Sequence, residues 1–280
     1  MPELPEVETI VRELNQQILR LKITEAILIR ADMLKRTGAD QRSLAAALDG
    51  CAFDYVERFG KYLLFHLDSG GKMLAHLGMT GKFVYCRADH PLDKHLCSQV
   101  FFANGWRLDH IDVRRFGRLE LYDQGEEIPT LTQLGVDPLS SSFNGKALKP
   151  LIYARNGKKR RQRAIHTLLL DQSLLAGVGN IYASEALFLA GIQPEKSAAR
   201  LKTADLKRLA AGLREILQSA LEYGGTTVSD FRRVDDKPGN FRDRLYVYDR
   251  TGEACRRCQT PIQRVRVGGR SVFFCPKCQK

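Results

Sequence analysis

The stretch CRRCQTPIQRVRVGGRSVFFCPKC, residues 255–278, contains two Cys-x-x-Cys pairs with 16 residues between them. Four cysteines at this spacing are typical of a tetrahedral zinc site with four thiolate ligands. Between the pairs, residues 262–267 alternate in polarity, Gly268 and Gly269 suit a tight turn, and residues 272–274 are apolar again. The stretch therefore predicts a β-hairpin that one structural Zn²⁺ clamps and that folds only with its metal. The predicted ligands are Cys255, Cys258, Cys275 and Cys278.

Arg270 follows the glycine turn directly, so it would stand at the tip of a rigid hairpin that also carries Arg264 and Arg266. The planar guanidinium binds a phosphate through two parallel hydrogen bonds, so this hairpin would suit anion recognition. The alternative interpretation of Arg270 is a solvated charge without a ligand, and the hairpin residues alone do not choose between the two.

The whole chain of 280 residues carries 44 Lys and Arg against 32 Asp and Glu, which gives a formal net charge of +12. This excess favours a polyanionic partner, with nucleic acid ahead of an anionic membrane surface. No apolar run approaches the roughly 18 residues that cross a bilayer, and glutamates occupy the place where a signal peptide needs positive charge. We therefore expect a cytoplasmic protein, in which disulfide pairing of the four cysteines is disfavoured.

Residues 128–224 have the periodicity and turn signals of a helical region. The segment GVGN at 177–180 separates two predicted helices, and Asn180 is expected to cap the second, whose free N–H groups would then face a phosphate. A plain asparagine cap is an equally good local interpretation. A longer helix is predicted over residues 202–223, with Thr203 as its N-cap.

Six basic side chains lie within the nine residues 155–163. Such a run is often a solvated arm, but in a basic protein it is also a plausible electrostatic footprint for nucleic acid. The six are Arg155, Lys158, Lys159, Arg160, Arg161 and Arg163.

Residues 22–122 contain many short segments rich in β-branched, aromatic and leucine residues, separated by turn signals. The pattern predicts an antiparallel β-sandwich or a flattened barrel. The clearest hairpin signal is Asn104-Gly105, because both residues tolerate the positive φ that a type I′ turn requires.

Two loops of this region combine glycine with side chains that could contact a ligand. Gly60 permits close backbone approach, and the following Lys61 could meet a phosphate, although a solvated strand edge explains it as well. Met79 lies in HLGMTG, residues 76–81, where the glycines could hold it outward. A methionine is more often a gap-filler of the core.

A third loop, DVRRFG at residues 112–117, places Arg114 close to Phe116. An exposed apolar wedge flanked by arginine suits insertion into a base stack, whereas a buried phenylalanine beside solvated arginines is the alternative. His95 stands in a polar loop, where it could contact a phosphate or simply be exposed.

The N-terminal stretch PELPEVETI, residues 2–10, has an ordinary helix start in Pro5 and Glu6. Pro2 is not explained by that helix. If Met1 is removed, the nitrogen of Pro2 becomes a basic secondary amine beside the carboxyl of Glu3, and such an amine can form an iminium with a sugar carbon. The stretch therefore raises the hypothesis of a catalytic N-terminal amine.

Taken together, PELPEVETI, FGKYL, HLGMTG, DVRRFG, GVGNIYASEALF and the four-cysteine hairpin resemble the bacterial formamidopyrimidine-DNA glycosylase family, also called 8-oxoguanine DNA glycosylase. The match runs from Pro2 to Gln279. The resemblance implies an α+β multidomain protein with three parts. These are an N-terminal helix and β-sandwich in residues 1–127, a helix-two-turn-helix domain in residues 128–224, and a flap loop with a zinc-finger β-hairpin in residues 225–280.

The resemblance also implies a catalytic set consisting of a nucleophile, a general acid, a proton-donating lysine and an arginine of the final elimination. These roles fall, in that order, on Pro2, Glu3, Lys61 and Arg270. The implied reaction is attack of Pro2 on C1′ of an extruded nucleotide while Glu3 protonates the opening sugar. The resulting iminium would permit β- and δ-elimination of the strand.

Further positions match contacts to DNA. Met79, Arg114 and Phe116 are similar to the three residues that fill the gap left by the extruded nucleotide, and His95 and Asn180 match phosphate contacts. One segment departs from the family's pattern.

Before the sequence LLLD at residues 168–171, many relatives carry lysines, whereas this chain has Gln162 and His166, with Arg161 and Arg163 alongside. We expect Gln162 and Arg163 to contact DNA. Which of these side chains meets the phosphate stays open.

The function that the resemblance implies is removal of oxidised purines from double-stranded DNA and cleavage at abasic sites by a monomer with one structural zinc ion. Two alternatives stay open: an endonuclease VIII-type glycosylase for oxidised pyrimidines, and a non-catalytic zinc-ribbon DNA-binding or ribosomal protein. The opening PELPEVET, in place of Pro-Glu-Gly-Pro, favours the purine enzyme by resemblance alone.

Overall fold

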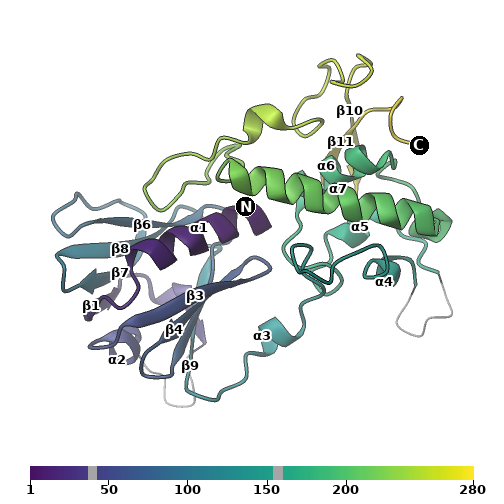
Figure 1. The fold of residues 1–280 in the computed structure, drawn as a ribbon. Helices are drawn as coiled ribbons and strands as arrows, with labels where there is room; N and C mark the ends of the chain where they lie inside the picture. Colours follow the sequence, from purple (N-terminus) through teal and green to yellow (C-terminus); the bar gives the residue numbers. More distant parts are fainter. Residues whose placement is uncertain (37–42, 154–159) are drawn as a thin grey trace. The chain divides into compact units, whose positions relative to one another are not determined.

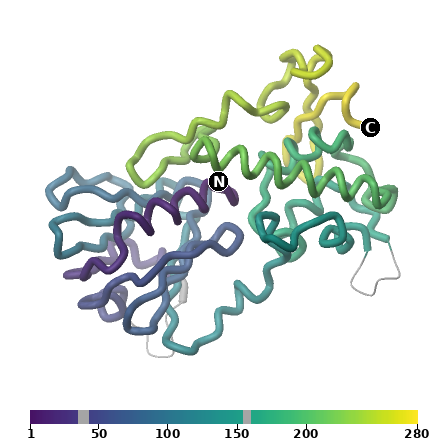
Figure 2. Tube along the Cα trace, viewed as in Figure 1, coloured from purple at the N-terminus to yellow at the C-terminus, as the bar shows by residue number. Residues whose placement is uncertain are grey.

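The computed structural model describes residues 1–36, 43–153 and 160–280 (Figure 1). The chain divides into two compact units. Unit 1 comprises Met1–Thr132 together with Tyr223–Arg242, and unit 2 comprises Gln133–Glu222 together with Asp243–Lys280. Figure 2 traces this path along the chain, from purple at the N-terminus to yellow at the C-terminus.

Unit 1 begins with helix α1 (Leu4–Gln17), which has Pro5 in its first turn, as the sequence predicts, and Glu3 as its N-cap. Apolar residues three and four positions apart form one stripe, and this stripe is fully buried against the strands. Its members are Leu4, Val7, Ile10 and Leu14.

The predicted sandwich is confirmed: unit 1 contains a four-stranded sheet in the order β1-β7-β8-β6 and a five-stranded sheet in the order β2-β9-β5-β4-β3. Phenylalanine pairs join the two sheets, with ring centroids 6.4 Å apart for Phe53 and Phe102 and 5.6 Å apart for Phe65 and Phe83. Pairing is antiparallel except for β2, which pairs with β9 in parallel.

The strands of the first sheet are β1 (Ile23–Leu28), β6 (Gly81–Arg87), β7 (Leu96–Phe102) and β8 (Trp106–Asp112). Those of the second are β2 (Leu34–Arg36), β3 (Phe53–Phe59), β4 (Tyr62–Leu67), β5 (Lys72–His76) and β9 (Arg118–Tyr122). The short elements of unit 1 are η1 (Ala31–Met33), α2 (Leu44–Leu48) and α3 (Pro129–Thr132).

The hairpin at Asn104-Gly105 exists, but the predicted type I′ turn is wrong. Gly105 donates its N–H to the carbonyl of Phe102, and of the turn residues 103–105 only Gly105 has a positive φ, +80°. The loop is therefore a three-residue connection in which the glycine alone takes the left-handed conformation. Asn104 instead accepts a hydrogen bond from the N–H of Trp106 through its side-chain oxygen.

Unit 2 carries the helices α4 (Lys149–Ile152), α5 (Ile165–Leu169), α6 (Asn180–Ala190) and α7 (Thr203–Glu222), the short helix η2 (Ala198–Arg200), and the hairpin of β10 (Gln263–Val267) and β11 (Arg270–Phe274). Helices α6 and α7 pack together at Gly212, where a Cβ would lie 3.0 Å from Cβ of Leu189. The prediction of Thr203 as an N-cap is wrong. Thr203 is already helical, and Asp205 instead accepts the N–H of Lys202.

The segment after α7 packs with unit 1, whereas the sequence-based division grouped residues 225–280 together. Glu6 of α1 accepts the N–H of Thr226, and Glu13 of α1 accepts hydrogen bonds from Arg233 and from the N–H of Val234. These long-range hydrogen bonds to α1 make the segment Tyr223–Arg242 part of unit 1. The loop ends in the short helix η3 (Arg242–Arg244).

Across the residues that the structure describes, no helix is both long and apolar enough to pass through a bilayer.

Two histidines, the buried His110 and the half-buried His76, give unit 1 a predicted acid sensitivity. Burial is the main cause that lowers the pKa of His76 and of His110 from 6.5 to about 4. Between pH 6.5 and pH 4, these histidines bind protons in the unfolded chain but not in the folded chain. The free energy of unfolding of unit 1 is therefore at its full value above pH 6.5 and decreases as the pH falls toward 4. We expect a loss of roughly 2 kcal/mol per histidine between pH 7.5 and pH 5.

Urea unfolding followed by the fluorescence of Trp106, the single tryptophan, measures this loss, because Trp106 lies in β8 of unit 1. The variant His110→Leu should keep about half of the pH dependence. An unfolding midpoint that stays constant between the two pH values would show that the histidines take up protons in the folded protein as readily as in the unfolded chain.

Candidate nucleic-acid site and zinc centre

A reciprocal pair of hydrogen bonds fixes the N-terminal residues at the start of α1. The N–H of Glu3 donates to Oε2 of Glu6 at 2.8 Å, and the side chain of Glu3 accepts the N–H of Glu6. The other oxygen of Glu6 accepts the N–H of Thr226 at 2.7 Å. Pro2, Glu3 and Glu6 are all buried. Hydrogen bonds to the side chain of Glu6 thus fix the position of Glu3 and of the neighbouring Pro2.

Sequence reasoning read Glu6 only as a favourable charge at a helix start. Its spacing of three residues from the N-cap is the signal for a capping box, which would have predicted the bond to Glu3. The bond to Thr226 joins residues 220 positions apart and has no local signal.

Lys61 lies in the turn between β3 and β4, where Gly60 has a φ of +57°. The solvated strand edge considered for Lys61 is wrong, because only 6% of the residue is exposed. The positive charges of Arg118 and Lys61 add to burial in lowering the pKa of His76 to about 4. The ring is therefore neutral, and its Nδ1 accepts the N–H of Gly78 at 3.1 Å.

Lys61 thus belongs to a packed polar cluster with a histidine that sequence reasoning did not single out. In the same cluster, Arg118 donates to the hydroxyl of Tyr62 at 2.8 Å, and the rings of Tyr62 and His76 have centroids 4.8 Å apart. The HLGMTG motif contained His76, but only the cross-strand pairing of β4 with β5 shows that it lies beside Tyr62.

Met79, Arg114 and Phe116 come together on the surface of unit 1, from two loops 30 residues apart. Met79 is 40% exposed and Phe116 is 58% exposed, so the core positions considered for them are wrong. The guanidinium of Arg114 lies between them, 3.1 Å from Sδ of Met79 and 4.6 Å from the ring centroid of Phe116. We call these three residues the wedge. Val113, which is 55% exposed, adds apolar surface beside it.

Asp112, which is 1% exposed, organises the wedge loop. Its Oδ1 accepts the hydroxyl of Thr80 at 2.5 Å and its Oδ2 accepts the N–H of Gly117 at 2.8 Å. Its backbone N–H donates to the carbonyl of His95 at 3.1 Å, which places the half-buried His95 next to this loop. At Gly78 a Cβ would lie 2.5 Å from the carbonyl carbon of Phe116, so only glycine allows the two loops to approach this closely.

In unit 2, the prediction that Asn180 caps α6 is wrong. The N-cap is Gly179, and Asn180 is the first residue of the helix. The Nδ2 of Asn180 donates to the carbonyl of Ser271 at 2.9 Å. Ser271 follows Arg270 in β11, so this bond ties the start of α6 to the exposed arginine of the hairpin. The structure therefore brings Asn180 and Arg270 into one local arrangement.

The basic run before α5 is only partly available to a ligand. Arg160 donates to the carbonyl of Ala199, and Arg161 donates to the carbonyls of Pro150 and Tyr153. Gln162 and Arg163 are both exposed. The remaining basic residues of the run lie outside the described residues; they are Arg155, Lys158 and Lys159.

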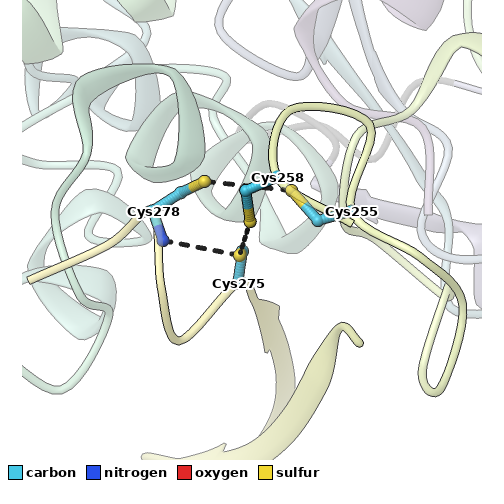
Figure 3. A group of neighbouring side chains, drawn as sticks. All are labelled: Cys255, Cys258, Cys275 and Cys278. Carbon is cyan, nitrogen blue, oxygen red and sulfur yellow. Dashed lines mark hydrogen bonds between the residues drawn. The ribbon is translucent and has the colours of Figure 1, made fainter. Parts of the chain in front are cut away.

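The four predicted zinc ligands converge (Figure 3), with their Sγ atoms all within 4.8 Å of one another. Cys255 and Cys278 have Sγ atoms 3.9 Å apart, and those of Cys258 and Cys275 are 3.4 Å apart. These separations exclude disulfides, whose sulfurs lie about 2 Å apart. They match the edges of a tetrahedron with Zn–S bonds of about 2.3 Å. The residues present therefore fit one zinc ion.

The predicted hairpin is confirmed between these pairs. Val267 pairs with Arg270, and the two-residue turn has positive φ at both Gly268 (+56°) and Gly269 (+80°). Both residues satisfy the type I′ pattern that fails at Asn104. Gly268 also approaches α5, since a Cβ there would lie 3.2 Å from Oγ1 of Thr167.

A buried carboxylate attaches the zinc module to α6. Glu185 is 0% exposed and accepts three backbone N–H groups, those of Tyr246, Val247 and Tyr248, at 2.7–2.9 Å. The guanidinium of Arg257 lies 4.5 Å from the ring centroid of Phe188. Sequence reasoning missed Glu185, because its partners lie about sixty residues further along the chain.

Three comparisons with known proteins agree with this arrangement. Residues 1–119 match the formamidopyrimidine-DNA glycosylase N-terminal domain, residues 134–232 the H2TH domain of the same enzymes, and residues 252–280 the zinc finger found in FPG and IleRS. The formamidopyrimidine-DNA glycosylase of Desulforamulus reducens is 39% identical over 283 residues, which cover 100% of this chain and 99% of the relative.

Solved structures are equally similar. The complex of Lactococcus lactis FPG (MutM) with DNA containing Fapy-dG has a TM-score of 0.88 and 34% identity, covering 99% of this chain and 100% of that chain. MutM in complex with DNA containing carbocyclic 8-oxo-G has a TM-score of 0.88 and 35% identity, with both chains fully covered. The chain belongs to the formamidopyrimidine-DNA glycosylase family.

Proposed function

We propose that this protein is a bifunctional DNA glycosylase and abasic-site lyase of base excision repair, which removes 8-oxoguanine and formamidopyrimidines from double-stranded DNA. The observation that carries the proposal is the set of hydrogen bonds through which Glu6 fixes Glu3 and the neighbouring buried Pro2. Removal of Met1 would turn the nitrogen of Pro2 into an amine beside the buried carboxyl of Glu3. The relatives named above, and the lesions present in their solved complexes, support the choice of oxidised purines. The protein would act as a monomer in the cytoplasm, on chromosomal DNA.

The wedge supports extrusion of the damaged nucleotide, because a base inside a duplex is out of reach of an enzyme's nucleophile. Met79 and Phe116 offer the exposed apolar surface that replaces the lost stacking, and Arg114 between them adds a positive charge. His95 and Asn180 would contact phosphates, and Gln162 and Arg163 would contact DNA. The net charge of +12 favours binding to DNA irrespective of the DNA sequence.

The chemistry then follows from the amine. The nitrogen of Pro2 forms a bond to C1′ while Glu3 protonates the opening sugar, and the bond between C1′ and the damaged base breaks. The resulting iminium makes a C2′ proton acidic. Its loss expels the 3′ phosphate, a second elimination expels the 5′ phosphate, and water releases the sugar fragment from Pro2. Lys61 would donate a proton during base release, and Arg270 would assist the final elimination.

The zinc ion has a structural part in this proposal. Cys255, Cys258, Cys275 and Cys278 would fill all four coordination positions, so no position is open to water or substrate. These residues hold the hairpin that carries Arg270.

Release of 8-oxoguanine from a duplex opposite cytosine, combined with borohydride trapping of the protein on that DNA, tests the function. We expect base release, strand cleavage on both sides of the lesion and a borohydride-dependent covalent adduct. Release of thymine glycol without 8-oxoguanine would favour the endonuclease VIII-type alternative. Tight binding without cleavage or adduct would favour the non-catalytic DNA-binding protein.

Truncation of the wedge should affect base release more than cleavage of a preformed abasic site. For Phe116→Ala we expect roughly a tenfold to hundredfold slower release of 8-oxoguanine, because the aromatic ring that would take the place of the extruded base in the stack is missing. An abasic nucleotide has no base to unstack, so its cleavage should change little. Single-turnover rates on the two DNA substrates measure the difference.

The matched control is Leu92→Ala, which removes another exposed apolar side chain of unit 1, one that is 66% exposed. Equal rates for the Phe116 and Leu92 variants on 8-oxoguanine DNA would argue against a wedge.

A further inference from the structure

His166 lies in α5 and is completely buried, with 0% of its surface exposed. Neither ring nitrogen has a hydrogen-bond partner within the described part of the chain. Buried polar groups in folded proteins are nearly always hydrogen-bonded, so an imidazole in this position needs an explanation. The reaction proposed above gives His166 no part.

A second orphan atom lies at the same place. Because the carbonyl of Ser271 can only accept, the group of Asn180 that faces it at 2.9 Å must be the NH₂ group, and this settles the orientation of the carboxamide. Oδ1 of Asn180 then points the other way, where it is buried and has no partner among the described residues. An amide oxygen there requires a donor.

The ring of His166 is the group that can supply it. Helix α5, which carries His166, contacts α6, which begins at Asn180, and Asn180 bonds to Ser271 next to Arg270. In agreement with this placement, the side chain of Asn180 and the charge of Arg270 both act on the pKa of His166. Burial, the largest cause, lowers this pKa from 6.5 to about 4, so the ring is neutral at physiological pH and carries one N–H.

We propose that His166 is a positioning residue, whose ring N–H donates to Oδ1 of Asn180 and holds the carboxamide in the orientation that serves DNA binding. One hydrogen of Nδ2 then bonds to Ser271, and the second is directed to a DNA phosphate. The inference rests on the proposed function for the phosphate role of Asn180. The hydrogen-bonded path from His166 through Asn180 to Ser271 connects α5, α6 and β11 next to Arg270.

The neutral ring also explains why a histidine suits this chain. A lysine at position 166 would donate to Oδ1 as well but would add a second positive charge beside Arg270. An imidazole with a low pKa donates without that repulsion. His166 can therefore orient Asn180 without a charge of its own, so that among His166, Asn180 and Arg270 only Arg270 is a cation.

A double-mutant cycle on affinity for duplex DNA with an uncleavable abasic-site analogue tests the proposal. His166→Leu should weaken binding about tenfold, and Asn180→Ala by at least that factor. If His166 acts only through Asn180, the double variant should bind as Asn180→Ala does. His166→Gln, which restores an N–H donor, should recover most of the affinity lost in His166→Leu.

His110→Leu is the matched control, because His110 is also buried, has no partner for either ring nitrogen among the described residues, and lies in β8 of unit 1. Its replacement should not weaken DNA binding. Provided that Asn180→Ala weakens binding, the proposal is overturned if His166→Leu binds DNA as the wild type does, or if it weakens Asn180→Ala by its full factor.

A measurement without DNA separates this proposal from the proposed function. In ¹⁵N-labelled protein, the side-chain NH₂ protons of Asn180 should exchange slowly with solvent, and His166→Leu should speed this exchange while His110→Leu should not. If Asn180→Ala keeps full DNA affinity, its phosphate role is wrong and the exchange rates alone decide about His166. Unchanged exchange in His166→Leu would contradict the positioning role in either case.

Discussion

Retention of Met1 is expected to reduce base release and strand cleavage at least about 1000-fold, because it turns the nitrogen of Pro2 into an amide. The lone pair of an amide nitrogen is delocalised into the carbonyl and does not add to a sugar carbon. Two preparations of the same chain, one beginning at Pro2 and one beginning at Met1, differ by a single residue, and intact mass distinguishes them. Single-turnover cleavage of DNA with 8-oxoguanine gives the ratio of their rates.

Binding provides the control for this pair. Met1 is 45% exposed and α1 begins only at Leu4, so the extra residue should leave the sandwich and the wedge in place. Affinity for an uncleavable abasic-site analogue should therefore differ little between the two preparations. Full cleavage activity in the chain that begins at Met1 would show that the nucleophile is another group.

The parts of the fold that were predictable depend on short-range patterns. The zinc hairpin follows from two Cys-x-x-Cys pairs and from Gly268-Gly269, where both residues take the positive φ expected of them. The stripe of α1 likewise follows from a period of 3.6 residues, and the sandwich follows from short segments rich in β-branched, aromatic and leucine residues between turn signals. In each case the residues that determine the element lie within it or beside it.

The missed details depend on partners far away in the sequence. Asn180 has the sequence context of a cap, yet its side chain bonds to Ser271, 91 residues later, and Gly179 takes the cap position. Asn104-Gly105 has the local signal of a type I′ turn, but the register of β7 with β8 leaves three loop residues instead of two. Local preference gives way where a tertiary contact or a strand register decides the geometry.

The same limit applies to the candidate site. Met79 and Phe116 were candidates from their own loops, but their exposure and their common contact with Arg114 depend on the buried Asp112. Glu6 organises the N-terminal residues in a comparable way. Carboxylates that accept backbone N–H groups from distant segments resemble surface charges in a sequence, so their role becomes visible only in the folded chain.

Zinc removal is the second change for which we expect a large effect. The strands β10 and β11 form a two-stranded sheet, and an isolated hairpin is at best marginally stable in water. Structural zinc supplies about 10–16 kcal/mol of binding energy in small zinc-finger peptides, which is folding energy for the module it holds. Without the ion, Arg270 and Ser271 lose their fixed positions, and Asn180 loses the carbonyl to which it donates.

We therefore expect a chelator, or the substitution Cys258→Ala, to weaken binding of an abasic-site analogue about a hundredfold, by loss of several contacts to DNA. The fluorescence of Trp106 should stay unchanged, because unit 1 contains none of the four ligands. Cys51→Ala, which removes a lone cysteine of unit 1, is the control, and added Zn²⁺ should restore the chelated wild type but not Cys258→Ala. Wild-type affinity in protein shown to contain no zinc would mean that α6, through Glu185 and Phe188, holds the hairpin without its metal.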